Sequence, residues 1–87
     1  MSFQKISIIV SVYNKEKVIS DCVESLLRLD YPKKKYEIIL VDDGSKDSTW
    51  KILQNYEENF RRITVFKKAN GGKGSAQNYG IRQCKGK

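Results

Sequence analysis

Three short apolar stretches, each rich in β-branched residues, constrain the fold more than any other feature of this sequence. Residues 6–13 read ISIIVSVY, residues 36–42 read YEIILVD and residues 63–67 read ITVFK. Runs that are apolar at nearly every position are typical of strands that are buried on both faces, as in a parallel sheet. We therefore expect three buried strands.

Between these stretches, apolar residues recur at helical spacing. The first such segment, which Asn14 can cap, is expected to end near Asp30 because Pro32 disfavours helical geometry just before it. Its apolar positions are Val18, Cys22, Val23, Leu26 and Leu27. The second segment is expected to begin at Asp47 or Ser48. Its apolar face consists of Trp50, Leu53, Tyr56 and Phe60.

With a shorter helix expected over residues 75–84, strands and helices alternate three times along the chain. This pattern predicts a Rossmann-like α/β fold of three layers (α/β/α), with a parallel sheet in the order 3-2-1, right-handed crossovers and helices on both faces. Three such strands make one mononucleotide-binding half of a doubly wound sheet. No linker or repeat interrupts residues 1–87, so we expect at most one domain.

Composition narrows the possible functions. The 87 residues include 17 Lys and Arg against 10 Asp and Glu, a net charge of +7 that suits a phosphate-bearing partner. Histidine is absent, which excludes Ser-His-Asp and Cys-His catalysis. Cys22 and Cys84 lack metal-ligand spacing and are expected to be buried thiols in a reducing compartment. No apolar run approaches the ~18 residues of a membrane span, and Met1 leads straight into a strand without a signal peptide. We expect a cytoplasmic location, or the cytoplasmic face of a membrane for the full-length protein.

In open parallel sheets, ligands bind beyond the carboxyl ends of the strands. Here each strand is followed by a polar segment: SVYN at residues 11–14, DDGS at residues 42–45 and NGGKGS at residues 70–75. Their convergence on one edge predicts a nucleotide-like ligand.

Two of these segments also have a plainer interpretation. The glycine segment matches neither the P-loop nor G-x-G-x-x-G, where Gln77 occupies the last glycine position, so it could be only a turn. Alternatively, its backbone N–H groups and Lys73 face a phosphate at a helix N-terminus. Asp42 and Asp43 could be solvated turn residues. Otherwise, Asp42 satisfies local backbone donors and Asp43 accepts a hydrogen bond from the N3–H of a uracil.

The stretches IIVSVYN, EIILVDDGSKDST and NGGKGSAQNYGI, in this order, resemble the N-terminal part of family 2 glycosyltransferases with the GT-A fold. The resemblance covers residues 6–86 and implies a site for the nucleotide of a nucleotide-diphospho-sugar, most often a UDP-sugar. It implies that Ser11 and Tyr13 touch the base and ribose, that Asp43 reads the base and that Lys73 faces the diphosphate. The site implied by the resemblance consists of Ser11, Val12, Tyr13, Asn14, Asp43, Gly44 and Lys73.

The resemblance also implies what these 87 residues lack. Family members continue into a fourth strand with an Asp-x-Asp motif that binds Mg²⁺ or Mn²⁺, and their general base lies further on. We therefore expect a partial family domain over residues 1–87 that contains no metal ligand and no catalytic residue, and is inactive alone. The complete enzyme would transfer the sugar to a glycan or lipid-linked acceptor in glycan or cell-envelope polysaccharide synthesis. Without a fourth strand, the first strand is an exposed edge, which favours self-association.

Two other classes of protein remain as alternatives. A receiver-like phospho-acceptor domain needs its acidic pair after the first strand, where this chain has Tyr13 and Asn14. A non-catalytic basic phosphate- or nucleic-acid-binding α/β module would explain the charge, but its basic residues should line one face with aromatic residues between them. Here the aromatic residues follow the apolar stripe of a helix, so we expect no nucleic-acid partner.

Overall fold

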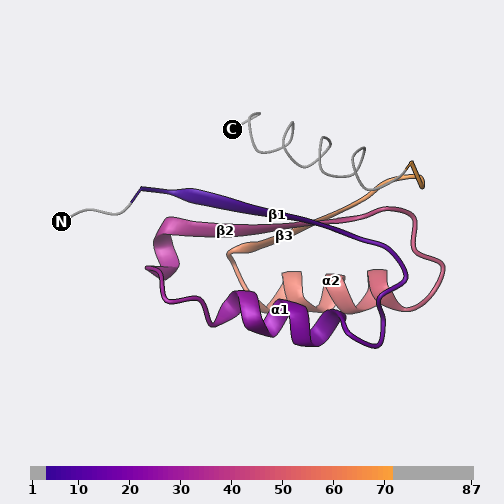
Figure 1. Ribbon diagram of the computed structural model, residues 1–87, viewed down its shortest axis with the longest axis horizontal. Coiled ribbons are helices and arrows are strands. Elements are labelled where there is room, and N and C mark those ends of the chain that lie inside the picture. Colours follow the sequence, from indigo (N-terminus) through magenta and orange to yellow (C-terminus); the bar gives the residue numbers. More distant parts are fainter. Residues whose placement is uncertain (1–3, 72–87) are drawn as a thin grey trace.

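The computed structural model describes residues 4–71, which form a three-stranded parallel sheet in the order β1-β2-β3 (Figure 1). The elements are β1 (Ile6–Val12), α1 (Ile19–Leu27), the short 3₁₀ helix η1 (Lys33–Lys35), β2 (Tyr36–Asp42), α2 (Thr49–Asn59) and β3 (Ile63–Lys67). The predicted parallel α/β fold and its strand order are confirmed. The helix expected over residues 75–84, together with Lys73, lies outside the described residues.

Both described helices pack against the same face of the sheet (Figure 1). The chain moves one strand over in the same direction at each crossover, and successive right-handed crossovers in one direction place their helices on one side. Helices were expected on both faces; the two described helices lie on one, and the third expected helix, over residues 75–84, lies outside the described residues.

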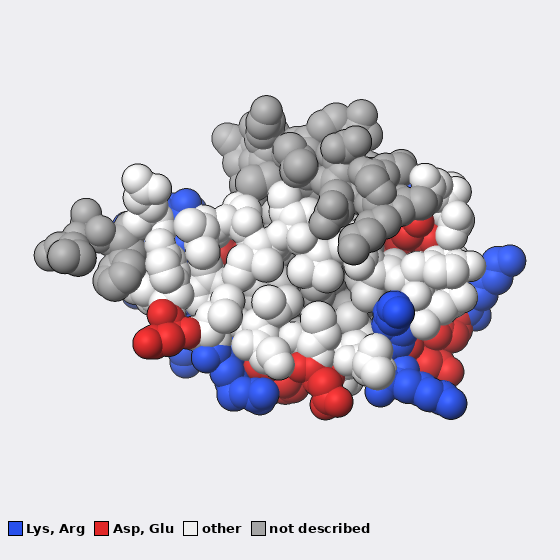
Figure 2. Space-filling view, viewed as in Figure 1, with Lys and Arg blue, Asp and Glu red and all other residues white. Residues whose placement is uncertain are grey.

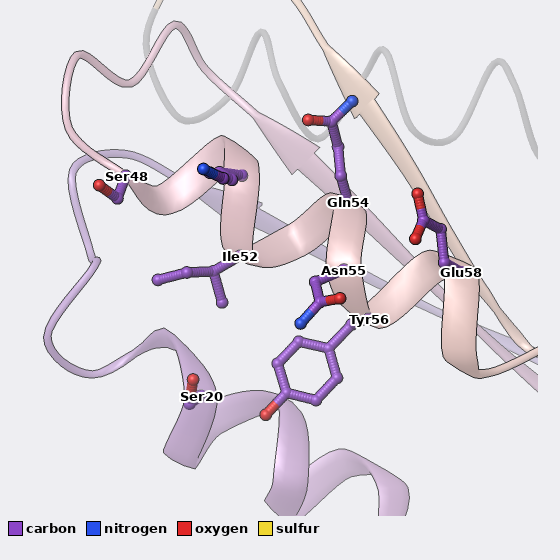
Figure 3. Close-up of a pocket in the computed structure, with 8 residues that line it drawn as sticks. Ser20, Ser48, Ile52, Gln54, Asn55, Tyr56 and Glu58 are labelled. Carbon is purple, nitrogen blue, oxygen red and sulfur yellow. The ribbon is translucent and has the colours of Figure 1, made fainter.

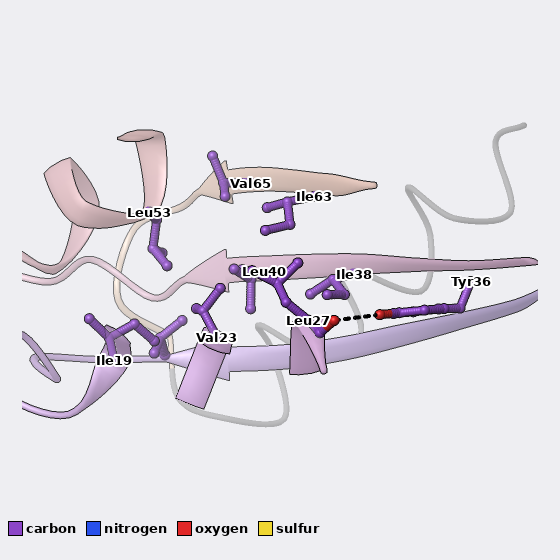
Figure 4. Packing of buried hydrophobic residues seen from close by; sticks show 10 residues of the cluster. Ile19, Val23, Leu27, Tyr36, Ile38, Leu40, Leu53, Ile63 and Val65 are labelled. Carbon is purple, nitrogen blue, oxygen red and sulfur yellow. Dashed lines mark hydrogen bonds between the residues drawn. The ribbon is translucent and has the colours of Figure 1, made fainter. Parts of the chain in front are cut away.

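The main core lies between the sheet and these two helices (Figure 4). Side chains alternate between the two faces along each strand, so every second strand residue points into this core. Its buried members are Val12, Ile19, Val23, Leu27, Tyr36, Ile38, Leu40, Leu53, Ile63 and Val65. On the opposite face, Ile39 and Val41 form a smaller cluster with Ile9 and Phe66.

Contacts from other elements meet the C-terminus of α1. The Tyr36 hydroxyl donates to the Leu26 carbonyl at 3.1 Å, and the Arg62 guanidinium donates to the Leu27 carbonyl at 3.1 Å. The guanidinium also lies 5.3 Å from the centre of the Tyr36 ring. A cation at this end of a helix complements its dipole and satisfies its last carbonyls. The helix therefore ends at Leu27 rather than near Asp30.

The predicted burial of the first cysteine is also wrong. Cys22, expected to be a buried thiol, is exposed and free. The buried positions of α1 are Ile19, Val23 and Leu27, spaced four residues apart, and Cys22 precedes the middle one. A narrow stripe of this kind leaves the adjoining position in solvent.

Candidate functional site

The carboxyl ends of the three strands are level with one another. Val12 pairs with Asp42, which in turn pairs with Lys67. The pairing continues for one further step, because the Asp43 N–H donates to the Val12 carbonyl at 2.8 Å and the Lys68 N–H donates to the Asp42 carbonyl at 3.0 Å. The first two polar segments and the described start of the third, as far as Gly71, therefore meet at one edge.

The two adjacent aspartates have different surroundings. Asp42 lies on the helix side of β2 and is fully buried. Its Oδ1 accepts a hydrogen bond from the Ser45 N–H at 2.9 Å, so the prediction that Asp42 serves a local backbone donor is confirmed. Its Oδ2 is also buried and has no hydrogen-bond partner within residues 4–71. This carboxyl group belongs to the fold of the β2–α2 loop.

Asp43 follows on the opposite side of the sheet, as the alternation of side chains requires. Its side chain is 6% exposed, and its Oδ1 forms an ion pair with the Lys68 ammonium at 3.0 Å. The same oxygen accepts a hydrogen bond from the Gly71 N–H at 2.9 Å. The Asp43 carbonyl accepts a third bond from the side-chain amide of Asn70 at 3.1 Å. The segment after β3 thus holds Asp43 through both its side chain and its main chain.

Gly44 makes this close approach possible. Its φ of 77° is in the left-handed region, and a Cβ at this position would lie 2.8 Å from the backbone nitrogen of Asn70. Glycine alone adopts this conformation without penalty, and it alone leaves room for a neighbouring backbone at this distance.

The residues predicted on the first segment separate into two groups. Tyr13 is 40% exposed, and Ser11 is half-buried on the sheet face opposite the helices, paired with Val41. The Val12 side chain, in contrast, is buried in the main core, so only its main chain is at the edge. The structure brings Ser11, Tyr13 and Asp43 to the same edge.

Asn14 does not cap α1, contrary to prediction. The residue before this helix is Val18, which makes no side-chain capping bond. Asn14 has a φ of 49°, and its side-chain oxygen accepts from the Lys46 N–H at 2.8 Å. Its own N–H donates to the Ser45 hydroxyl at 2.8 Å. Asn14 therefore joins the β1–α1 loop to the β2–α2 loop, a role that local spacing cannot reveal.

Further bonds join these two loops, and we call the set Asn14, Glu16, Ser45, Asp47 and Thr49 the loop clasp. The Lys15 N–H donates to the Thr49 hydroxyl at 2.8 Å, and that hydroxyl donates to Asp47 at 2.5 Å. Glu16 donates its N–H to Asp47 at 3.3 Å and accepts from the Ser48 N–H at 2.9 Å. The hydrogen bond from the Thr49 hydroxyl lowers the pKa of Asp47 from its usual value.

The N-cap of α2 is Ser48, one of the two residues predicted for that position, although its side chain makes no capping bond. The carboxylate of Asp47 instead accepts from the Thr49 N–H at 2.9 Å. A carboxylate beside the first turn also complements the helix dipole. The loop clasp thus begins α2 and, through Asn14, fixes the backbone that carries Tyr13.

A separate groove lies between α1 and α2 (Figure 3). Its lining includes Ser20, Ile52, Asn55 and Tyr56, and none of the predicted site residues belongs to it. Tyr56 donates its hydroxyl to Glu24 at 2.9 Å. Burial raises the pKa of Tyr56, and the neighbouring Glu24 carboxylate adds to this shift. The groove belongs to the helix layer and not to the edge where the strands end.

The charge distribution offers no support for a nucleic-acid surface on the face shown in Figure 2. Lys and Arg side chains there interleave with Asp and Glu along the helix layer instead of forming a continuous basic stripe. Trp50, Tyr56 and Phe60 are partly buried and pack against the main core, as their spacing predicted.

The described residues do not form a metal site. Within residues 4–71 no three His, Cys, Asp or Glu side chains lie close enough to hold an ion. Asp43 has an ammonium group and an amide N–H on its Oδ1, and a carboxylate in such surroundings is a poor ligand for a second cation. In the same part of the chain, no helix has the length and apolar character that a membrane crossing would require.

A parallel sheet whose loops converge at the carboxyl ends of its strands is the arrangement in which open α/β domains bind their ligands. Residues 7–87 match the family model described as "Glycosyl transferase family 2", and the chain belongs to this family of glycosyltransferases. It is 43% identical over 84 residues to the poly(ribitol-phosphate) beta-glucosyltransferase of Bacillus spizizenii. It is 35% identical over 83 residues to the poly(ribitol-phosphate) beta-N-acetylglucosaminyltransferase TarS of Staphylococcus aureus.

Solved structures show the same GT-A fold. TarS residues 1–349 in complex with UDP-GlcNAc are similar with a TM-score of 0.81 at 36% identity, over 92% of this chain and 23% of that one. The mannosyltransferase PcManGT from Pyrobaculum calidifontis, in complex with GDP-Man and Mn²⁺, has a TM-score of 0.85 at 26% identity, over 94% of this chain and 25% of that one. The two sequence relatives are matched over 94% of this chain, which spans only 13% and 14% of their lengths.

Proposed function

We propose that this chain is the N-terminal, donor-nucleotide-binding part of a glycosyltransferase that uses a UDP-sugar. The acceptor would be a glycan or lipid-linked molecule in glycan or cell-envelope polysaccharide synthesis. The observation that carries the proposal is Asp43, a nearly buried carboxylate fixed at the same carboxyl edge of the sheet as Ser11 and Tyr13. The relatives named for glucosyl and N-acetylglucosaminyl transfer to poly(ribitol-phosphate), and the TarS complex with UDP-GlcNAc, support the same donor and acceptor classes.

The proposed roles follow from what each group can do chemically. Asp43, as a carboxylate, accepts the N3–H of uracil. Tyr13 has enough exposed ring to stack on the base, and the Ser11 hydroxyl can bond to the base or ribose. Lys73, which lies outside the described residues, would face the diphosphate.

The remaining site residues shape this edge. Val12 contributes its main chain, whose carbonyl accepts the Asp43 N–H. Asn14 fixes the loop that carries Tyr13, and Gly44 allows the segment after β3 to approach Asp43. Substitutions of these residues should therefore alter nucleotide binding through backbone position.

A divalent ion neutralises charge on a diphosphate leaving group. We infer that the main ligands of any Mg²⁺ or Mn²⁺ in the complete enzyme lie outside residues 4–71, where no three His, Cys, Asp or Glu side chains form a site for an ion. The 87-residue chain should therefore release no UDP from UDP-sugars, with or without Mn²⁺. We propose a cytoplasmic location, or the cytoplasmic face of a membrane for the complete enzyme, with which the free thiol of Cys22 is compatible.

The test is an NMR titration of the chain with UDP and UMP. We expect weak binding with little difference between the two nucleotides, and amide shifts at residues 11–14 and 43–45. Asp43→Ala should weaken binding by about tenfold or more, the loss of one charge-assisted hydrogen bond. Asp42→Ala is the matched control, because Asp42 bonds within its own loop. It should lower stability but leave the affinity of the folded protein nearly unchanged.

Equal losses of affinity in the two variants would contradict this site, as would shifts confined to Lys33–Lys35. Salt-dependent binding of random-sequence DNA, with no response to UDP, would instead favour the basic nucleic-acid-binding module.

A further inference from the structure

Lys68 follows β3 and forms a nearly buried ion pair with the residue proposed to read the base. Its side chain is 15% exposed and that of Asp43 is 6% exposed, with 3.0 Å between Nζ and Oδ1. The ammonium also donates to the Ala69 carbonyl at 2.5 Å. Buried pairs are screened by salt far less than surface pairs, so the interaction persists at physiological ionic strength.

The backbone of Lys68 is as firmly placed as its side chain. Its N–H continues the β2–β3 ladder by donating to the Asp42 carbonyl at 3.0 Å. Two donors from the same segment, the Lys68 ammonium and the Gly71 N–H, converge on Oδ1 of Asp43. The carboxyl group therefore has one orientation, which is set by residues that follow β3.

The ammonium also favours the ionised form of Asp43. Burial alone favours a neutral carboxylic acid, which can donate a hydrogen bond, whereas an adjacent cation favours the ionised form. An ionised carboxylate can only accept hydrogen bonds. Lys68 therefore favours a group at this edge that bonds to a ring N–H over one that bonds to a ring nitrogen lone pair.

We propose that Lys68 is a positioning residue that sets base selectivity through Asp43. This role rests on the nucleotide site proposed above. With Lys68 in place, the site accepts bases that present a ring N–H, such as the N3–H of uracil. It rejects cytosine, whose N3 carries a lone pair that repels the carboxylate. A buried polar group left facing the wrong partner is a strong source of discrimination.

The chain supplies a matched control one residue earlier. Lys67 is exposed and points to the other side of β3, where its ammonium lies 5.6 Å from the centre of the Trp50 ring. Removing either lysine lowers the net charge by the same amount, but only Lys68 touches Asp43. A general attraction for phosphate would respond equally to both changes.

The experiment compares the affinities of the 87-residue chain for UMP and CMP by NMR titration. Lys68→Met should weaken UMP binding by about tenfold and CMP binding much less, so that the UMP preference contracts. Lys68→Arg should retain most of that preference, because it keeps a cation beside Asp43. Lys67→Met should weaken both nucleotides equally and only slightly. In an Asp43→Asn background, Lys68→Met should no longer change the preference.

A native amide spectrum with an unchanged UMP preference in Lys68→Met would overturn the proposal, as would an equal change in Lys67→Met. Lys68→Gln, which keeps a donor without a charge, is measured alongside. If both neutral variants, Lys68→Met and Lys68→Gln, are unfolded, the ion pair between Asp43 and Lys68 serves the fold alone, and its proposed role in base selectivity is overturned. A wild-type chain that binds UMP and CMP equally would refute the selectivity but keep the nucleotide site. A folded wild-type chain that binds neither would refute the site and, with it, this role of Lys68.

Discussion

Gly44→Ala should destabilise the chain by an amount that the structure allows to be worked out. An alanine at a φ of 77° pays the left-handed penalty of about 1–2 kcal/mol. Its Cβ would also lie 2.8 Å from the backbone nitrogen of Asn70, so that backbone must move. Against this, the alanine restricts the unfolded chain and returns about 0.4–1 kcal/mol. We expect a net loss of about 1–3 kcal/mol.

Urea unfolding followed by Trp50 fluorescence measures this loss. A small domain has about 5–15 kcal/mol of stability and an m-value of about 1 kcal/mol per molar urea, so the midpoint should fall by about 1–3 M. Gly44→Asn is the matched control, because asparagine tolerates the left-handed region better than alanine and carries the same Cβ. It should lose about 1 kcal/mol less than Gly44→Ala, and its remaining loss reports the contact with Asn70.

The reasoning would be refuted if Gly44→Ala unfolded at the wild-type midpoint. Equal losses of stability in the alanine and asparagine variants would show that the left-handed backbone conformation of Gly44 does not contribute. The contact of the added Cβ with the Asn70 backbone would then be the whole explanation. The Gly71 amide resonance gives an independent reading. A shift of Asn70 should disturb the bond from the Gly71 N–H to Asp43, and with it the binding of UMP.

Three further outcomes are expected. Asp47→Asn should lower stability at neutral pH and converge with the wild type as pH falls below about 3.9, because a carboxylate with a lowered pKa stabilises only where it is ionised in the folded chain. Burial raises the pKa of Tyr56, so the wild-type chain should lose stability above about pH 10, where the unfolded state ionises this tyrosine more readily than the folded state. Tyr56→Phe should reduce that loss, and identical stability curves for variant and wild type at alkaline pH would contradict this. Sedimentation should show self-association through β1, which within residues 4–71 pairs only with β2, and Ile6→Lys should reduce it; a 10.1 kDa monomer at all concentrations would exclude it.

The sequence was most informative where structure depends on local pattern. The bounds of β2 and β3 were predicted to the residue, because both are short runs in which β-branched, aromatic and other apolar residues predominate, a composition and length that favour strands. The end of α1 was placed too late, because it depends on Tyr36 and Arg62, which reach the last carbonyls of the helix from other elements. Spacing along the chain carries no information about such partners.

The same distinction explains what was predicted of the site. Asp43 stood out as one of two adjacent aspartates at a strand end, whereas Lys68 was only one of several basic residues. The register of β2 against β3 identifies it, since Lys68 follows the residue paired with Asp42. A rule that pairs the first residues after neighbouring parallel strands could have found this contact from the predicted strand bounds alone.

The stretch DDGSKDST therefore combines two kinds of requirement. Asp42, Ser45, Asp47 and Thr49 make bonds that form the loops, and they would be needed whatever ligand occupied the edge. Asp43 alone directs a carboxylate to the side of the sheet where Ser11 lies, and its state depends on a lysine outside the stretch. A chain could keep most of this motif, and the fold with it, while a change at residue 68 altered its choice of nucleotide. The motif is thus strong support for the fold of the family, whereas we expect the preferred base to depend on the pair formed by Asp43 and Lys68.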